Sequence, residues 1–229
     1  MEVTLISPAK AWLLDFIPTI FFSILISIIG VACFTYIIAK RTAPLVRAKL
    51  DPRLNSVPER LANMLKFAIG QYRQPRYMMA GGLHIVLFAG FMILSLRSIT
   101  LVILGLKDGF VLPGLDGVAG QIYSVLKDIA ATSVFLACVV GMVRRGIFQP
   151  KRYDVPKKYG KDHTSEAVFV LMLITALVTC DMIFEGTQVA AQMQKGLHAE
   201  FLLPGMGAWM AAGILNGANL STLQNLRPR

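Results

Sequence analysis

A single histidine inside a long apolar run is the residue whose chemistry is most informative. His84 follows a basic, proline-containing segment, Gln71–Tyr77, and has apolar residues on both sides. An ionisable side chain in a membrane span is costly to bury and usually has a function. Because a neutral imidazole is a good metal ligand, His84 is a candidate axial ligand of a haem iron. The structural alternative is that the imidazole hydrogen-bonds a neighbouring helix.

A second group of ionisable residues lies at the opposite depth of the apolar runs. Counted at ~1.5 Å per residue from the basic ends of their runs, its members lie mostly ~20–28 Å along. Isolated charges at that depth are unfavourable, so we expect Arg97 to pair with Asp181 or Glu185. A structural ion-pair layer, a quinone or haem-propionate site, and a proton path all remain open. The members are Arg97, Lys127, Asp128, Asp181 and Glu185.

The other histidines and the cysteines give weaker signals. His163 lies in a basic segment, where we expect it to be solvated, and His198 lies near Glu200. One histidine and one carboxylate do not make a metal site. The cysteines are far apart in sequence and each lies in an apolar run, which favours core-like thiols without a disulfide framework. They are Cys33, Cys138 and Cys180.

The composition is that of a membrane protein. The 229 residues are 55% hydrophobic and only 16% charged, whereas soluble domains carry about 25% charged residues. The mean hydropathy is +0.60. The formal net charge of +10 would suit a nucleic-acid-binding protein, but such a protein would not contain these apolar runs. We therefore expect a lipid bilayer as the environment and no nucleic-acid partner.

Four apolar runs are long enough to cross a bilayer as helices, which takes roughly 20 residues. A fifth run, 205–218, is short and rich in glycine, and is expected to be interfacial or re-entrant. The sequence therefore predicts an all-α integral membrane protein. A bundle of four transmembrane helices would occupy residues 1–200, followed by an extracytoplasmic or interfacial apolar tail, 201–229. The four runs cover approximately residues 16–39, 78–106, 120–143 and 166–190.

The distribution of Lys and Arg predicts the orientation of the chain. Basic residues gather in the segments 40–77 and 144–165, whereas the N-terminal segment and the segment 107–119 carry one each. Cytoplasmic loops collect Lys and Arg. We therefore expect the N-terminus outside and both basic segments in the cytoplasm.

Part of the first basic segment has the pattern of an amphipathic helix. Within residues 55–70, apolar side chains recur at helical spacing. A basic surface helix commonly rests on anionic lipid. A docking surface for a cytoplasmic redox partner is the alternative. The apolar positions are Leu61, Met64, Leu65 and Ala68.

The segment around His84 resembles one protein family. Gly70-Gln71, basic residues with a proline, Tyr77 and then Gly82–Phe91 (GLHIVLFAGF) are similar to the N-terminal membrane domain of bacterial membrane-bound, heterodisulfide reductase-like iron–sulfur oxidoreductases. These enzymes are thought to pass electrons from electron-transfer flavoprotein to menaquinone. Phe184-Glu185-Gly186 also matches. The domain is related to the haem b gamma subunit of respiratory nitrate reductase, and the resemblance covers approximately residues 16–215.

The resemblance implies a fold, a cofactor and a site. Relatives have five helices, an outside N-terminus in the bacterial inner membrane, and haem ligands on helices two and five. His84 would be the helix-two axial ligand of a haem b near the cytoplasm, with Phe88, Gly90 and Phe91 along the same helix. Relatives with two haems have a further histidine at the position of Leu94.

The resemblance also implies partners. The fifth helix and the cysteine-rich iron–sulfur region of the family have no counterpart before Arg229, so no iron–sulfur cluster is expected in this chain. It would be a fragment or a split subunit. The implied partner is a cytoplasmic iron–sulfur protein or a missing C-terminal domain, with electron-transfer flavoprotein as a candidate donor.

Three functions compete at this point. The first is a membrane electron-transfer subunit of a quinone-linked oxidoreductase, carrying haem b and serving menaquinone. The second is a cofactor-free membrane anchor or assembly subunit of a redox complex. The third is a small transporter built around the charged layer. For the first, a second axial ligand is needed, and Met142 and Met172 are the thioethers nearest the His84 side.

Overall fold

The computed structural model describes residues 12–13, 17–48, 56–107, 110, 112–115, 117–148, 164–194, 196 and 201–216. Four of its helices are long and apolar enough to cross a membrane. They are α1 (Thr19–Arg47), α3 (Met78–Leu104), α4 (Val118–Val143) and α5 (Thr164–Gln194). The prediction of an all-α, multi-pass membrane protein with four spans is therefore confirmed. The orientation of the N-terminus stays a prediction.

The remaining elements are short. Two strands of two residues each, β1 (Trp12–Leu13) and β2 (Ile17–Pro18), form an antiparallel pair before α1. Between α1 and α3 lie a helix, a π-helical turn and a 3₁₀ turn, and α4 continues into a second π-helical turn. A further helix follows α5. These are α2 (Val57–Met64), η2 (Leu65–Ile69), η3 (Gln74–Arg76), η4 (Arg144–Phe148) and α6 (Gly207–Asn216).

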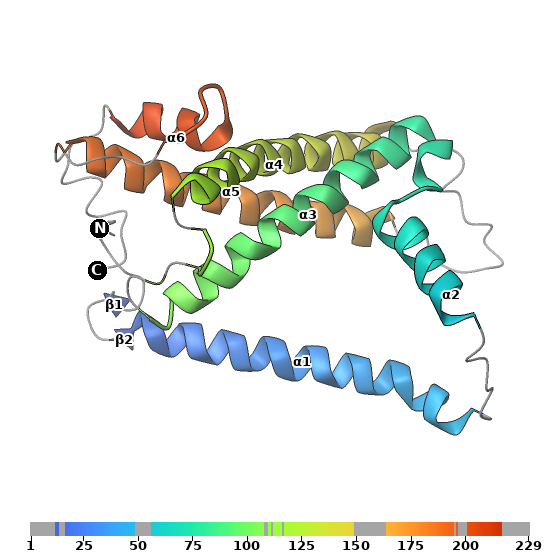
Figure 1. Cartoon of the computed structure of the whole chain (residues 1–229). Helices are drawn as coiled ribbons and strands as arrows, with labels where there is room; N and C mark the ends of the chain where they lie inside the picture. The colour runs from blue at the N-terminus through green and yellow to red at the C-terminus, as the bar shows by residue number, and fades with distance from the viewer. Residues whose placement is uncertain are drawn as a thin grey trace.

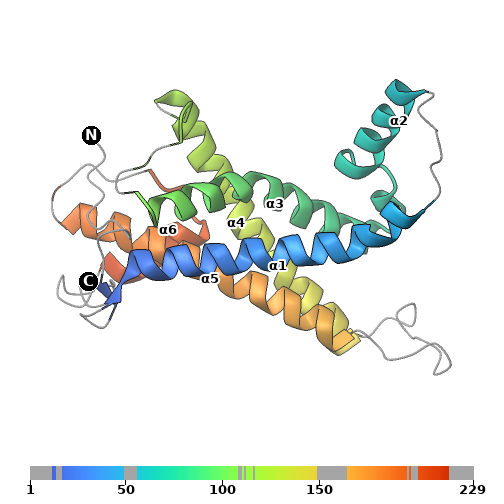
Figure 2. The ribbon, with the colours of Figure 1, turned by 90° about the horizontal axis from the view of Figure 1, so that it is seen from below.

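Helices α3, α4 and α5 form the packed part of the molecule, while α1 flanks it (Figures 1 and 2). No residue of α1 is buried. Apolar side chains cover this helix, so it carries the surface of a helix that meets lipid or another protein. It comes close to α3 at Gly105, just after the end of that helix, where an added Cβ would lie 2.8 Å from Ser23 Oγ.

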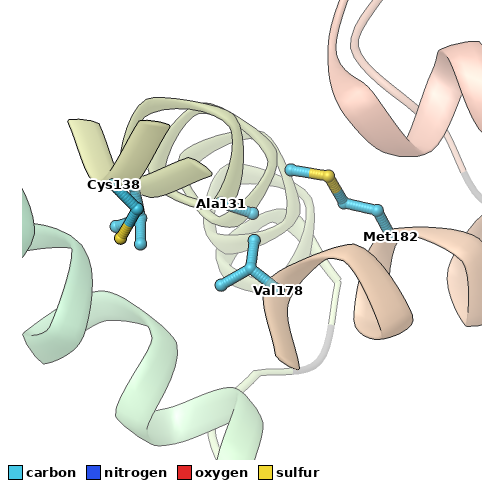
Figure 3. Packing of buried hydrophobic residues seen from close by; sticks show 5 residues of the cluster. Ala131, Cys138, Val178 and Met182 are labelled. Carbon is cyan, nitrogen blue, oxygen red and sulfur yellow. The ribbon is translucent and has the colours of Figure 1, made fainter. Parts of the chain in front are cut away.

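The hydrophobic core lies between α4 and α5 and is covered by α3 (Figure 3). Small residues let the helices approach, because lipid gives no hydrophobic force that would press them together. At Gly90 of α3, a Cβ would collide with the side chain of Val134 on α4. Leu87 and Leu94 of α3 pack on the same core. Its buried members are Ala131, Val134, Cys138, Val178 and Met182.

Only one of the three cysteines is a core thiol. Cys138 is completely buried between α4 and α5. Cys33 and Cys180 are free and exposed on the surface of their helices. The expectation of three core-like thiols is therefore wrong for these two. Their apolar surroundings in sequence reflect the membrane span and not a protein core.

The amphipathic segment predicted for residues 55–70 is helical, which confirms that part of the sequence analysis. It comprises α2 and η2, and every residue from 56 to 70 is exposed. The following turn η3 is held tightly against the start of α3. A Cβ at Gly81 would overlap the backbone carbonyl of Gln74, so glycine is required for this contact.

Helix α6 lies against α5 and α4 near the end of α5 (Figure 1). With ten residues it is too short to span a bilayer. A small apolar cluster joins it to α5. Residues 201–216 thus pack on the bundle, whereas 217–229 lie outside the described residues. The cluster consists of Val189, Leu202, Ala208 and Ala212.

Candidate functional site: a histidine on α3 and a polar layer around α6

The side chain of His84 is exposed on α3, about 9 Å along the helix axis from Met78. Phe88 and Phe91 follow at intervals of four and three residues, so the three residues share one face. Phe91 is 66% exposed. The neighbouring face, with Leu87 and Leu94, packs on the core. His84 therefore points away from the core formed with α4 and α5.

His84 makes no hydrogen bond or ion pair with any residue of the described part of the chain. A helix–helix hydrogen bond was the structural alternative for this side chain. Neither α4 nor α5 provides one. Because an imidazole in hydrocarbon needs a polar partner, this alternative requires a group beyond the residues described here.

The glycines around His84 are explained mainly by protein packing. The turn η3 packs directly against Gly81, and the side chain of Val134 on α4 packs directly against Gly90. Only Gly82 faces open space, with no heavy atom within 4 Å of an added Cβ.

The donor set near His84 fits one axial ligand of a haem. His163 and His198 lie outside the described residues. Met182 is buried in the core and contacts the position of Gly207, so its sulfur is engaged elsewhere. Among the described residues, no group of three metal-ligating His, Cys, Asp or Glu side chains comes together. One imidazole on an open apolar face fits a shared site whose second ligand comes from another helix.

The second candidate site contains all five charged residues predicted as a layer. The Nε atom of Arg97 on α3 lies 3.4 Å from Asp181 Oδ1 on α5, and both side chains are largely buried. This confirms the predicted pairing of Arg97, with Asp181 as its partner. Asp181 and Glu185 are four residues apart on α5 and so share one face.

Lys127 and Glu185 form a second ion pair in this layer, between α4 and α5. It is more deeply buried than the first: Lys127 is 4% exposed and Glu185 is 6% exposed. Buried charges are tolerated only when they are paired and hydrogen-bonded. The two ion pairs join α5 to α3 and to α4.

Asp128 performs a different task, since it receives the segment that leads into α6. Its Oδ2 atom accepts a hydrogen bond from the backbone N–H of Leu203 at 3.0 Å. One turn further along α4, Thr132 Oγ1 accepts the N–H of Gly207, the first residue of α6, at 3.1 Å. The first N–H groups of a helix have no partner within it. Thr132 supplies such an acceptor for Gly207 at the start of α6, and Asp128 supplies one for Leu203 in the segment before α6.

Two members of the layer were not identified from sequence. Tyr123 donates a hydrogen bond to the carbonyl of Ile93 on α3 at 3.1 Å and lies within electrostatic range of Arg97 and Asp181. Thr132 is the other. Its position four residues after Asp128, on the same face of α4, was the available signal. An uncharged hydroxyl was overlooked because membrane helices carry many Ser and Thr residues.

Gly186, beside Glu185, lies at a close approach of α5 to α6. A Cβ at this position would lie 2.8 Å from the backbone N of Ala212 and 2.9 Å from the carbonyl of Ala208. Two neighbouring residues of α5, Glu185 and Gly186, therefore make contacts with two different helices. Glu185 meets Lys127, and Gly186 makes room for α6. We name the polar layer as Arg97, Tyr123, Lys127, Asp128, Thr132, Asp181 and Glu185.

The Arg97–Asp181 pair makes a prediction about coupled substitutions. Arg97→Leu and Asp181→Leu should each lower the folded yield, because each leaves the other charge in an apolar span. The double variant should lose less than the sum, with a coupling free energy of about 0.5–3 kcal/mol. Thermal unfolding of the purified variants in detergent measures it. Strictly additive losses would show that the two side chains do not interact.

Comparison with models of known protein families, with curated proteins and with solved structures gave no match.

Proposed function

We propose that the chain is a membrane electron-transfer subunit that holds haem b through His84. It passes electrons between a cytoplasmic iron–sulfur protein or flavoprotein and menaquinone. The proposal includes an outside N-terminus and a place in the bacterial inner membrane, which rest on the Lys and Arg distribution and on the resemblance around His84. Haem b supplies a one-electron carrier within the span.

The observation that carries this proposal is the state of the His84 imidazole. It lies in an apolar span, exposed on α3, and none of the described residues satisfies it. In hydrocarbon, an imidazole without a hydrogen bond or metal is unfavourable. The imidazole is therefore open to a ligand from outside the described residues. A haem would satisfy both features, because its iron would accept the nitrogen lone pair and its ring would cover the apolar face.

The residues of this chain would perform defined tasks in such a site. His84 supplies the nitrogen ligand, and Phe88 and Phe91 give the same face of α3 an apolar surface that excludes water. A helix of the partner would supply the other protein ligand. If the partner covers this face of α3, the face would be exposed in the single chain. A six-coordinate iron would then require the partner.

The polar layer has a structural task in this proposal. Its contacts include two ion pairs between its own members, a hydrogen bond to the backbone of α3, and hydrogen bonds to the backbone of Leu203 and Gly207. No side chain of the layer is assigned to menaquinone or to a propionate. The cofactor-free anchor is the second candidate function, and the two ion pairs favour it, because such pairs stabilise a bundle without a ligand.

An absorption spectrum separates the two candidates. The chain co-expressed with the proposed cytoplasmic iron–sulfur partner should show the Soret and alpha bands of low-spin haem b, with about one haem per chain. The chain alone should bind haem poorly or leave it five-coordinate. A folded complex without any haem absorption would contradict the electron-transfer proposal and leave the anchor.

A further inference from the structure

The segment between α1 and α3 contains an amphipathic helix that none of the other described helices covers. We call Val57–Ile69, which comprises α2 and η2, the amphipathic arm. One face is apolar, and the other carries Glu59, Asn63 and Lys66. The apolar face lies at the helical positions Val57, Leu61, Met64, Leu65 and Ala68.

The apolar face of the arm is open along its whole length. Val57 is 52% exposed, Leu61 is 50% exposed and Met64 is 56% exposed. In both ribbon views the arm projects away from α3, α4 and α5 (Figures 1 and 2). Within the described part of the chain, α2 has substantial packing only with η2, its own continuation. Such a face needs a cover that the bundle does not supply.

The connection to α3 fixes the level of the arm at the membrane surface. Met78 begins a span that must cross the hydrocarbon, and Gly81 holds the turn η3 directly against its first residues. The arm precedes this turn by only a few residues. The C-terminal end of the arm, at Ile69, therefore lies near the interface between hydrocarbon and water. At this level an amphipathic helix can lie in the plane of the membrane.

A cluster of cations and aromatic rings stands at that junction. Lys66 Nζ lies 4.5 Å from the centroid of the Tyr72 ring, and Arg73 Cζ lies 4.6 Å from the centroid of the Phe67 ring. The two rings pack edge to face at 6.2 Å. Tyrosine and long basic side chains are enriched at this level of membrane proteins, because each joins an apolar body to a polar end.

The charge of the region is complementary to an anionic surface. From residue 56 to residue 76 there are four basic residues and one acidic residue, Glu59, which gives 4 − 1 = +3. Basic residues beside a membrane are attracted by anionic headgroups. The basic residues are Arg60, Lys66, Arg73 and Arg76.

From these observations we infer that the amphipathic arm is an anionic-lipid-binding element. Its apolar face inserts at the headgroup boundary of the leaflet on its own side, and its basic residues contact the phosphates of acidic phospholipids. An acidic protein would satisfy the cations as well. It would not explain the continuous apolar face at the level of the membrane surface. The inference goes beyond the proposed electron transfer and does not depend on His84.

The test uses the full chain in nanodiscs of either phosphatidylglycerol or phosphatidylcholine. Cys33, Cys138 and Cys180 are replaced by alanine, and an environment-sensitive fluorophore is attached at Leu61→Cys. Asn63→Cys, on the polar face of the same helix, is the matched control. In phosphatidylglycerol we expect blue-shifted emission from position 61 with quenching by brominated lipid, and aqueous emission from position 63.

Neutralising cations should weaken the insertion in a graded way. Each substitution Lys66→Gln or Arg73→Gln should lower the membrane-inserted fraction relative to the free fraction about fivefold in phosphatidylglycerol. Neither should have this effect in phosphatidylcholine. Equal aqueous emission from positions 61 and 63 in phosphatidylglycerol would overturn the inference. So would burial of position 61 that is the same in both lipids, or that arises only when the cytoplasmic partner protein is added.

Discussion

Lys127→Leu is expected to destabilise the protein by about 3–5 kcal/mol, because it leaves the buried Glu185 carboxylate without the Lys127 ammonium. Both side chains are less than one-tenth exposed, so water cannot replace the lost partner. The double variant Lys127→Leu with Glu185→Leu should recover most of this loss, since apolar residues of similar volume suit the same space. Thermal unfolding in detergent, followed by the fraction of monodisperse protein, measures the differences.

Lys107→Leu is the matched control for this experiment. Lys107 is exposed beyond the end of α3, and surface substitutions usually change stability by no more than about 0.5 kcal/mol. If Lys127→Leu were as stable as Lys107→Leu, the buried pair would not contribute as described. A double variant with the full sum of the single losses would equally contradict the pairing.

Gly186→Val is expected to detach α6 from the bundle. A side chain at this position would overlap the backbone of Ala208 and Ala212, which cannot move aside as a flexible side chain can. Overpacking of this kind usually costs about 1–3 kcal/mol, and it would act on the contact with α5, which is the most extensive packing of α6. Ala212 is buried when α6 is in place. In the Gly186→Val protein, the thiol of Ala212→Cys should therefore react with a maleimide about tenfold faster than in the protein that keeps Gly186.

Gly213→Val provides the control within the same helix. Gly213 has no heavy atom within 4 Å of an added Cβ, so the substitution changes the same residue type without a collision. It should leave the labelling rate of Ala212→Cys unchanged. Similar rates for the Gly186 and Gly213 variants would show that the close approach of α5 and α6 does not hold α6 in place.

The spans could be predicted from sequence because hydropathy reports directly on the solvent of each segment. The boundaries of α3 and α4 agree closely with the predicted runs. Helix α1 continues to Arg47, beyond the predicted end at residue 39. A span read from hydropathy ends at its first basic residues, although the helix itself continues into the polar region.

The packing could not be predicted in the same way. Hydropathy gives Cys138 and Cys180 the same environment, yet one lies in the core and the other on the helix surface. The face that a span turns inward depends on small residues and polar contacts, as at Gly90 and Gly186. Single-sequence patterns do not reveal which partner each glycine meets.

The candidate sites, like the fold, could be predicted only in part from the sequence. Charged residues are rare in membrane spans because their burial is unfavourable. This made all five charged members of the polar layer recognisable in the sequence, and it also predicted that Arg97 is paired. The contacts of Asp128 with Leu203 and of Thr132 with Gly207 depend on where residues 201–207 return to the bundle. That return is a tertiary event, and the short, glycine-rich segment 205–218 did not specify it.

The most direct test of the central claim is chemical rescue of His84→Gly by imidazole, in the complex with the partner. If His84 is the axial ligand, the variant should lose the low-spin haem b spectrum. Millimolar imidazole should then restore it, because the free base can occupy the position of the missing side chain. The Phe91→Leu variant, which keeps the ligand, should retain the spectrum without imidazole. An unchanged low-spin spectrum in His84→Gly without imidazole would contradict the assignment.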